Sequence, residues 1–451
     1  MFSIMDVTTA KQTILKRSAI DEITVPEKLL AQLAQTFGEP IQPAEAVRRI
    51  LQDIRRNGDA ALQSWTKRLD WAEIPQPRIP EAAIQAALTS LDPALRSALE
   101  EAAGRIEKFH RKQPLISWID QSLGGTLGQI LRPIQQVGFY VPGGTAPLPS
   151  SVLMSVIPAR VAGVSRIVIA TPPARQTGEM NPVILAAAAI AGADEIYAAG
   201  GAQAIGALAF GTETILQVDK IVGPGNLFVT LAKQQVFGRV GIDGLAGPTE
   251  TVLIADEYAD PAWAAADLLA QAEHDILASA ILLTPSRSFA GKVQTEIENF
   301  LTGKETIDLG RKEIILQSLA ARGGAVITGS IAEAIALSNE FAPEHVSLAV
   351  KDAWGWLDSI QAAGGVFLGE HSCEVMGDYI AGPSHIMPTG GTARFSSPLN
   401  LWDFVRIISV VNLDSKTAAR LGAQAEQIAR AEGLNAHALA GSLRSQSIPD
   451  L

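Results

Sequence analysis

The sequence predicts an α/β fold whose parallel sheets are built from repeated units of strand, glycine turn and helix. Short runs of β-branched or apolar residues alternate with helical segments rich in small residues, and glycines separate the two. This alternation is typical of βαβ units. The chain has 451 residues, which is more than one ordinary domain holds, so roughly two to four folded units are expected.

Composition excludes several classes of protein. Hydrophobic residues make up 47% of the chain and charged residues 18%, a balance typical of soluble globular proteins. The formal net charge is -11 without a dense basic cluster, so a nucleic-acid partner is not expected. The most apolar stretch, Val183 to Ala191, is too short to span a membrane, and the first residues lack the core of a signal peptide. A single cysteine, Cys373, excludes an internal disulfide and a thiolate-rich zinc site, so we expect a cytoplasmic protein.

The N-terminal part, to about residue 135, is expected to be mainly helical. Residues 44–71 carry apolar side chains at helical spacing, with a break at Gly58 and Asp59, and Pro93 opens a second amphipathic helix. The charged side chains of this part are expected to solvate the helix faces, and they indicate no chemistry.

The first α/β set follows. The sequence VGFYVPGGTAPLPSS, from Val137 to Ser151, reads as a strand that enters a glycine-proline loop. Three further strands, in RIVIATPP, EIYAAGG and KIVGPGN, each end in a turn and precede a helix. Ligands of parallel sheets collect beyond the carboxyl ends of the strands, which here hold Tyr140, residues 200–203 and residues 223–226. No GxGxxG fingerprint occurs in this set, so a bound dinucleotide and simple tight turns both stay open.

A second α/β set begins at TVLIADE, continues through SAILLTPS, AVITG and HVSLAV, and ends at GGVFLGE. Helical segments separate these strands, among them AWAAADLLAQAEHD. After the second set, the apolar segment NLWDFVRIISVV and two helical segments form a tail. The tail is too short for a domain of its own, so we expect it to dock on another part of the protein.

The loop GDYIAGPSHIMPTGG, from residue 377 to residue 391, follows the last of these strands. Its glycines and prolines predict irregular backbone, while Tyr379, Ile380, Ile386 and Met387 are expected to pack inward. Its Asp378 and His385 are two possible metal ligands. A turn-capping aspartate and a hydrogen-bonded histidine are the alternative.

Histidine, a scarce residue here, is concentrated in the second half of the chain: five of six follow residue 250, and only His110 precedes it. Asp267, Gln271 and His274 fall at i, i+4 and i+7 of one predicted helix, which places them on one stripe. An exposed polar face would give the same stripe. The helix ends near a strand, however, so that Gln271 and His274 are candidates for a site.

Further polar pairs are found near the strands and in the tail. Glu344 and His345 lie at the entry of the strand HVSLAV and form a plausible acid-base pair. Glu432 and His437 flank a glycine break in the tail. Two histidines, an aspartate and a neutral oxygen donor would complete a zinc shell without thiolates, although glutamine is an unusual ligand. Cys373 is either a reactive thiol or a small buried side chain.

Several long motifs, in order along the chain, resemble those of the histidinol dehydrogenases. They are VGFYVPGG, AAGGAQAIGALAFGT, KIVGPGN, VGIDGLAGPTE, QAEHD, FAPEHVSL and GDYIAGPSHIMPTGGTARF. The resemblance runs from about Ala44 to His437. It implies a zinc-dependent cytoplasmic enzyme that oxidises L-histidinol through L-histidinal to L-histidine with two NAD, the last steps of histidine biosynthesis.

The same resemblance implies a role for individual residues. The zinc ligands are Gln271, His274, Asp378 and His437. The catalytic pair is Glu344, which activates water, and His345, which removes the alcohol proton. Substrate contacts come from the zinc ligands, from His345, and from Thr249, His385 and Glu432. NAD contacts come from Tyr140, Gln203 and Asn226.

The resemblance also implies the domain organisation and a homodimer. Two incomplete, doubly wound Rossmann-like α/β domains are expected, with small helical extensions at both ends. The expected ranges are 1–35 for the N-terminal helical extension, 36–137 with 250–398 for a larger domain carrying zinc and the catalytic residues, 138–249 for an inserted NAD-binding domain, and 399–451 for a helical tail. The tail would enter the partner's site, so that Glu432 and His437 act in trans.

Two other functions remain open from sequence. A paralogue could oxidise another small polar alcohol, such as a sulfonated diol, but His385 and Glu432 suit a substrate with an imidazole and an amine. A zinc-binding protein with a dead site could serve regulation, but the pair Glu344 and His345 argues against it. The turn His371 to Cys373 departs from the family pattern, and the residues before Ala44 carry no motif.

Overall fold

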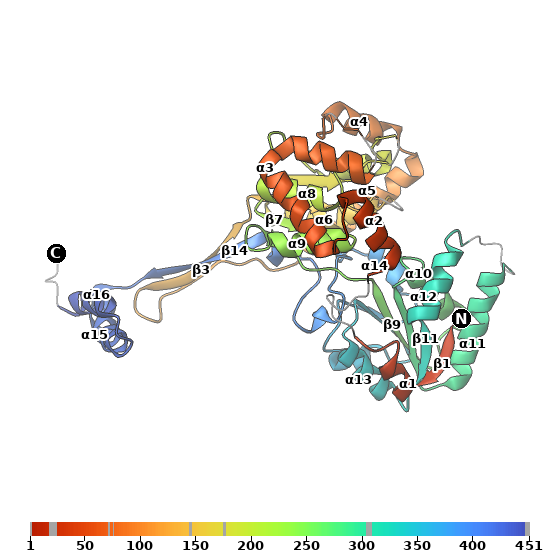
Figure 1. Cartoon of the computed structure of the whole chain (residues 1–451). Coiled ribbons are helices and arrows are strands. Elements are labelled where there is room, and N and C mark those ends of the chain that lie inside the picture. Colours follow the sequence, from red (N-terminus) through yellow and green to blue (C-terminus); the bar gives the residue numbers. More distant parts are fainter. Residues whose placement is uncertain are drawn as a thin grey trace.

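The computed structural model describes residues 2–17, 25–70, 73–74, 76–143, 147–174, 177–303 and 309–446. Within these residues the chain forms two α/β lobes and a long arm that projects away from both (Figure 1). One lobe is built on a five-stranded sheet and the other on a six-stranded sheet, while a three-stranded sheet forms the arm. The predicted α/β fold class is confirmed.

The five-stranded lobe has a parallel sheet covered on both faces. Its strand order is β6 (Glu195–Ala198), β5 (Arg166–Thr171), β4 (Gln136–Tyr140), β7 (Lys220–Val222) and β8 (Gly241–Ile242). One face packs against α4 (Glu81–Ser90), α5 (Pro93–His110), α6 (Pro149–Ala162) and α7 (Pro182–Ala191). The other packs against α3 (Pro43–Asp70), α8 (Gly201–Phe210) and α9 (Leu227–Val236), and α2 (Glu27–Phe37) lies on α3. Chain order reverses between β4 and β7, which is where such sheets bind ligands.

The six-stranded lobe repeats this three-layer plan. Its parallel strands run in the order β1 (Ser3–Asp6), β11 (Gly324–Ile327), β10 (Ser279–Thr284), β9 (Glu250–Ala255), β12 (His345–Ala349) and β13 (Gly365–Leu368). One face is covered by α10 (Pro261–Ala272), α11 (Arg287–Thr302) and α12 (Lys312–Arg322). The other is covered by α1 (Val7–Gln12) and α13 (Ile331–Phe341). Every residue of β9 and β10 is buried, because helices cover both faces of the sheet.

The arm is an antiparallel ribbon that ends in two helices. The ribbon contains β2 (Trp118–Asp120), β3 (Thr126–Pro133) and β14 (Val405–Asn412), and the helices are α15 (Ser415–Ala431) and α16 (Asn435–Ser445). Both helices lie at the far end of the ribbon, away from the lobes (Figure 1). The two helices pack closely at Gly422, where a Cβ atom would lie only 2.6 Å from the carbonyl oxygen of Gly441. Glycine permits this approach because it has no Cβ.

The packing differs from the predicted domain ranges in three places. Helices α3 to α5, predicted within the range 36–137 of the larger domain, pack on the five-stranded sheet instead. The range 1–35, predicted as helical, contributes β1 to the six-stranded sheet. The range 399–451 is not wholly helical, because it contains β14. Short strands and amphipathic helices carry no information about which sheet they join, so these assignments need long-range contacts.

The predicted break at Gly58 is a kink within α3. Gly58 has φ 50° and ψ −128°, a conformation that glycine adopts at little cost. A Cβ atom there would lie 2.2 Å from a carboxylate oxygen of Glu213, and that carboxylate accepts a hydrogen bond of 2.7 Å from the backbone of Asp59. Among the described residues, no helix is both long and apolar enough to cross a bilayer.

Candidate active site between the two lobes

A cavity of about 470 Å³ opens between the lobes. The six-stranded lobe lines it with residues predicted for the site: Thr249, His274, Glu344, His345, Asp378 and His385. The five-stranded lobe contributes Leu148, Ser151, Pro224 and Asp243. The volume of the cavity is that of a small-molecule site. In it the structure brings together six residues that are up to 136 positions apart, from Thr249 to His385.

The six-stranded lobe contributes the amino ends of its strands to this cavity. Thr249 precedes β9, and His345 is the first residue of β12. The two strands are neighbours, with His345 in register with Thr251. Helix α10 runs back along the sheet, so its C-terminus delivers His274 to the same edge. The rule that ligands bind beyond carboxyl ends therefore does not find this half of the site.

His345 lines the cavity, and its two ring nitrogens have different surroundings. Its Nδ1 lies 3.3 Å from the carbonyl oxygen of Glu250 and 3.4 Å from the hydroxyl of Thr251. A carbonyl oxygen only accepts hydrogen bonds, so Nδ1 carries the proton in the neutral ring. The Nε2 atom is buried without a hydrogen-bond partner among the described residues, and lies 3.7 Å from Asp378 Oδ1. It is therefore free to accept a proton.

Three buried carboxyl groups surround His345. Burial raises the pKa of Glu344 to about 7, of Glu374 to about 8 and of Asp378 to about 7. Nearby carboxylates raise them further, while the charge of His345 opposes the rise for Glu344 and Asp378. The Glu344 carboxylate accepts a hydrogen bond of 3.2 Å from the backbone nitrogen of Glu250. So many acids in one buried space suit a bound cation or proton transfer.

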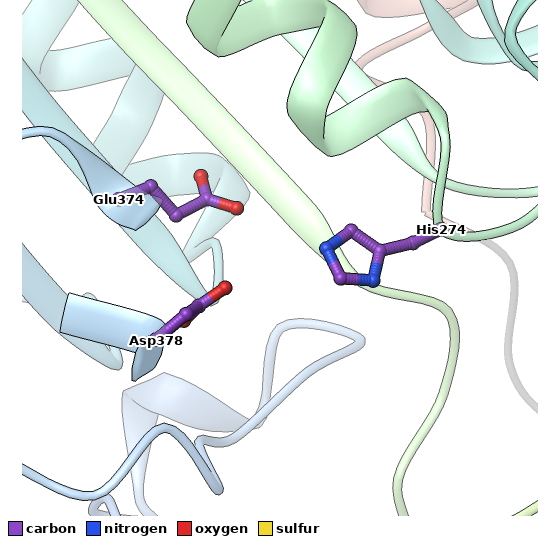
Figure 2. A group of neighbouring side chains, drawn as sticks. All are labelled: His274, Glu374 and Asp378. Atoms are coloured by element: carbon purple, nitrogen blue, oxygen red, sulfur yellow. The ribbon is translucent and has the colours of Figure 1, made fainter. Parts of the chain in front are cut away.

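His274, Glu374 and Asp378 form a cluster that could hold a metal ion. Each offers one ligand atom, and these atoms all lie within 4.8 Å of one another. Figure 2 shows the carboxylates of Glu374 and Asp378, both from α14 (Glu374–Tyr379), turned toward the ring of His274. The side chain of His274 is exposed. Partial desolvation of its ring by the surrounding protein nevertheless lowers its pKa, and the charges of His345 and Arg311 lower it further.

Gln271 lies beside this cluster and is fully buried. Its Nε2 atom has no hydrogen-bond partner among the described residues, and its Oε1 atom lies 3.4 Å from the Thr249 hydroxyl. An exposed polar face, the alternative interpretation of the stripe, is therefore wrong for Gln271. Asp267, at the other end of the stripe, is half-buried, and burial raises its pKa to about 6, with the charge of Glu370 as a smaller cause.

Glu374 is a site residue that the sequence analysis missed. It is 4% exposed, its carboxylate accepts a hydrogen bond from the Thr251 hydroxyl, and its Oε1 lies 3.7 Å from His345 Nδ1. The available signal was the i, i+4 spacing of Glu374 and Asp378, which places both on one helical face. The predicted loop starting at residue 377 hid it, because residues 377–379 belong to α14.

His385 joins the two lobes. Its Nδ1 lies 2.8 Å from the carbonyl oxygen of Asp378, and its Nε2 lies 3.2 Å from the hydroxyl of Ser151, on α6. The carbonyl fixes the proton on Nδ1, so Nε2 accepts from Ser151. Burial lowers the pKa of His385 to about 4, which keeps the ring neutral at pH 7. Ile380 and Ile386 pack on the five-stranded lobe as predicted, but Tyr379 is 54% exposed, so its predicted inward packing is wrong.

Known proteins share this architecture and sequence. A sequence profile of histidinol dehydrogenases matches residues 37–445. The chain is 47% identical over 419 residues to the histidinol dehydrogenase of Deinococcus radiodurans, which covers 93% of this chain and 94% of that protein. It is 50% identical over 400 residues to the histidinol dehydrogenase of Thermus thermophilus, and the match covers 89% of this chain and 94% of that protein. The crystal structure of histidinol dehydrogenase from Elizabethkingia anophelis has a TM-score of 0.88 and 38% identity, covering 99% of this chain and 98% of that chain.

The chain belongs to the histidinol dehydrogenase family. The resemblance seen in the sequence motifs is thereby confirmed, and with it the prediction that the chain is an enzyme, an oxidoreductase.

In the five-stranded lobe, three residues from the histidinol dehydrogenase motifs lie at the carboxyl edge of the sheet: Tyr140, Gln203 and Asn226. All three are outside the lining of the cavity. The Tyr140 hydroxyl accepts a hydrogen bond of 3.1 Å from the backbone of Gly201. Gln203 donates to Asp70 at 3.0 Å, while its buried Oε1 has no partner among the described residues. Asn226 accepts hydrogen bonds from the first turn of α9 as its N-cap.

Glu432 and His437 are not brought to the cavity by their own chain. Glu432 ends α15 and His437 lies in α16, so both are at the far end of the arm (Figure 1). Both side chains are exposed. His371 is also exposed and packs edge-on against Trp263, while Cys373 is half-buried at the start of α14.

Proposed function

We propose that the protein is a zinc-dependent histidinol dehydrogenase that oxidises L-histidinol through L-histidinal to L-histidine with two NAD, the last steps of histidine biosynthesis in the cytoplasm. Family membership supports the reaction class. The single observation that carries the proposal is the free Nε2 of His345, buried beside the His274, Glu374 and Asp378 cluster in a cavity shared by both lobes.

In this proposal His345 is the general base. Its Nδ1 proton is fixed by the Glu250 carbonyl oxygen, so the unpartnered Nε2 is the nitrogen that would accept the proton of an alcohol bound beside it. Glu344 lines the same cavity, and its raised pKa of about 7 lets it exchange a proton near neutral pH. We assign to Glu344 the activation of water for the second oxidation.

The side chains near His274 fit a zinc ion. The fit rests on the unpartnered buried Nε2 of Gln271, whose amide group can turn its oxygen toward a metal, and on the nitrogen and oxygen donors of the cluster. Gln271, His274 and Asp378 would hold the ion together with a partner's His437, and Glu374 would supply compensating charge. Zinc, when bound, would orient the amine and imidazole of the substrate and polarise its alcohol.

The carboxyl edge of the five-stranded sheet fits NAD. Gln203 leaves a buried oxygen unpartnered there, and Gly223, at φ 119°, has no space for a Cβ because that atom would lie 2.2 Å from the carbonyl oxygen of Tyr140. Backbone this close at the reversal between β4 and β7 suits a ligand. Tyr140, Gln203 and Asn226 would bind the cofactor, and NAD would accept the hydride.

The arm supports a homodimer with shared sites. Several large apolar side chains are exposed on it: Trp118, Ile119, Ile407, Val411, Ile428, Leu439 and Leu443. An apolar surface of this extent favours a second protein chain. A second copy of the same chain would cover it and deliver Glu432 and His437 to its partner's cavity, where His385 and Thr249 would contact the substrate with them.

NADH formation tests the proposal. With L-histidinol we expect two NADH for each molecule oxidised, and no comparable rate with small diols, including sulfonated ones. His345→Asn should abolish the rate, whereas His371→Asn, an exposed histidine against Trp263, should keep it. Turnover of a sulfonated diol but not of histidinol would favour the paralogue. No turnover with any alcohol, together with tight zinc binding, would favour a regulatory protein.

A further inference from the structure

Arg17 joins two segments of the six-stranded lobe that lead into the candidate active site. Its guanidinium forms an ion pair with the carboxylate of Glu250, with Nη2 2.9 Å from Oε2. It also donates to the carbonyl oxygen of Phe341 at 3.0 Å and to that of Ala342 at 3.2 Å. The loop after α14 passes nearby, because a Cβ added at Gly391 would lie 3.4 Å from Arg17 Nε.

Glu250 links Arg17 directly to the proposed catalytic pair. Its side chain is 4% exposed and is paired with Arg17. Its backbone nitrogen donates to Glu344 at 3.2 Å, and its backbone oxygen lies 3.3 Å from His345 Nδ1. A shift of Glu250 would therefore move the hydrogen-bond partners of both side chains.

The segment that carries Glu344 and His345 needs support of its own. Ala342, which ends α13, has φ 49°, and it is the single non-glycine residue with positive φ in the described part of the chain. Such a conformation is unfavourable for a residue with a Cβ and persists only where surrounding contacts hold it. Arg17 supplies those contacts, because it binds the carbonyl oxygens of Phe341 and Ala342 and its guanidinium lies 3.6 Å from the centre of the Phe341 ring.

We propose that Arg17 is a positioning residue that fixes the start of β9 and the Ala342 turn in one arrangement, and so sets the geometry of Glu344 and His345. This inference rests on the proposed function. Arg17 lies outside the cavity lining, so it acts through Glu250 rather than by touching the substrate. It also precedes residue 37, where the match to the family profile begins.

Lysine can make only part of these contacts. Its ammonium group is a compact charge that could pair with Glu250, whereas the planar guanidinium spreads its donors and binds a carboxylate and two carbonyl oxygens at once. Lys11 offers a matched control in the same N-terminal segment. It pairs with Glu340 on α13 at 2.7 Å, and both side chains are exposed, so its removal leaves the contacts of Arg17 with Glu250, Phe341 and Ala342 intact.

The test compares Arg17→Ala, Arg17→Lys and Lys11→Ala with the wild type. For Arg17→Ala we expect kcat with histidinol to fall by about 10- to 100-fold, the effect of small misplacement of reacting groups, with KM changed by less than about threefold because the cavity lining is intact. Arg17→Lys should fall between Arg17→Ala and wild type, and Lys11→Ala should match the wild type.

Amide hydrogen exchange gives a second measurement that does not depend on activity. We expect faster exchange at residues 341–345 and at Glu250 in Arg17→Ala, without global unfolding, and no change in Lys11→Ala. Unchanged exchange at these residues, or a kcat equal to that of the wild type, would overturn the proposal. Wild-type protein that does not oxidise histidinol would refute the proposed function, and the exchange measurement would still decide the role of Arg17.

Discussion

Sharing of the site between two chains can be tested with two inactive variants. His274 lies at the cavity and His437 lies in α16 at the far end of the arm (Figure 1). If α16 of one chain completes the cavity of the other, each site takes His274 from one chain and His437 from the partner. His274→Ala and His437→Ala should then each be inactive alone, and a mixture of both should recover activity.

The size of the recovery follows from this geometry. In an equal mixture, half of the dimers contain one chain of each variant, and one of their two sites has both histidines intact. The mixture should therefore show about a quarter of wild-type activity per site. Mixed dimers isolated through two different affinity tags should show about half. Activity is measured as NADH formation after co-expression, so that the chains assemble together.

A double variant supplies the matched control. Wild type mixed with His274→Ala/His437→Ala should show about a quarter of full activity if sites are shared, because every mixed dimer has lost one histidine from each site. It should show about half if each chain completes its own site. A mixture of the single variants that stays inactive, combined with a half-active double-variant mixture, would refute the shared site.

The remaining predictions concern stability, the arm and the metal. Arg166 donates two hydrogen bonds to Glu195 and lowers its pKa from 4.5 to about 2, which stabilises the fold by at most about 3 kcal/mol. This contribution is nearly complete above pH 4.5 and declines as pH falls toward 2. Glu195→Gln should therefore lower the unfolding temperature at pH 7 and lower it by less than half as much at pH 3; an equal loss at both would contradict it. Gly441→Val should separate α15 from α16, since a Cβ at Gly441 would lie 2.7 Å from the carbonyl oxygen of Gly422. Proteolysis of the arm should then be faster and activity lower, while the lobes should unfold at the wild-type temperature. A chelator should abolish NADH formation, and added zinc should restore it. Asp378→Asn should retain less zinc after dialysis than the wild type. Full activity in metal-free protein would rule out the metal role.

Local pattern predicted most elements of the lobes correctly. The strands of both sheets other than β1 and β8, the helix opened by Pro93 and the break at Gly58 follow from residue types and spacing alone. The reason is physical: burial on both faces selects continuous apolar runs for β9 and β10, and glycine selects the kink. The motifs also named six residues that the cavity brings together.

The residues that the sequence analysis missed act through distant contacts. Glu374 belongs to the site because Thr251 and His345 lie beside it. Arg17 meets Glu250, from which it is 233 positions away in the chain. Neither residue stands in a motif, and an isolated charge is usually a solvated one. Their roles depend on which segments fold side by side.

The sequence by itself determined most element types, six of the residues that line the cavity and the family, because side-chain pattern and motif order are properties of the chain. Tertiary structure alone decided that β9 lies between β10 and β12, which puts the site at the amino edge of one sheet. It also decided that α3 to α5 join the five-stranded lobe and that the tail stands on an arm. These features come from the packing of surfaces far apart in sequence, and local periodicity does not encode which surfaces meet.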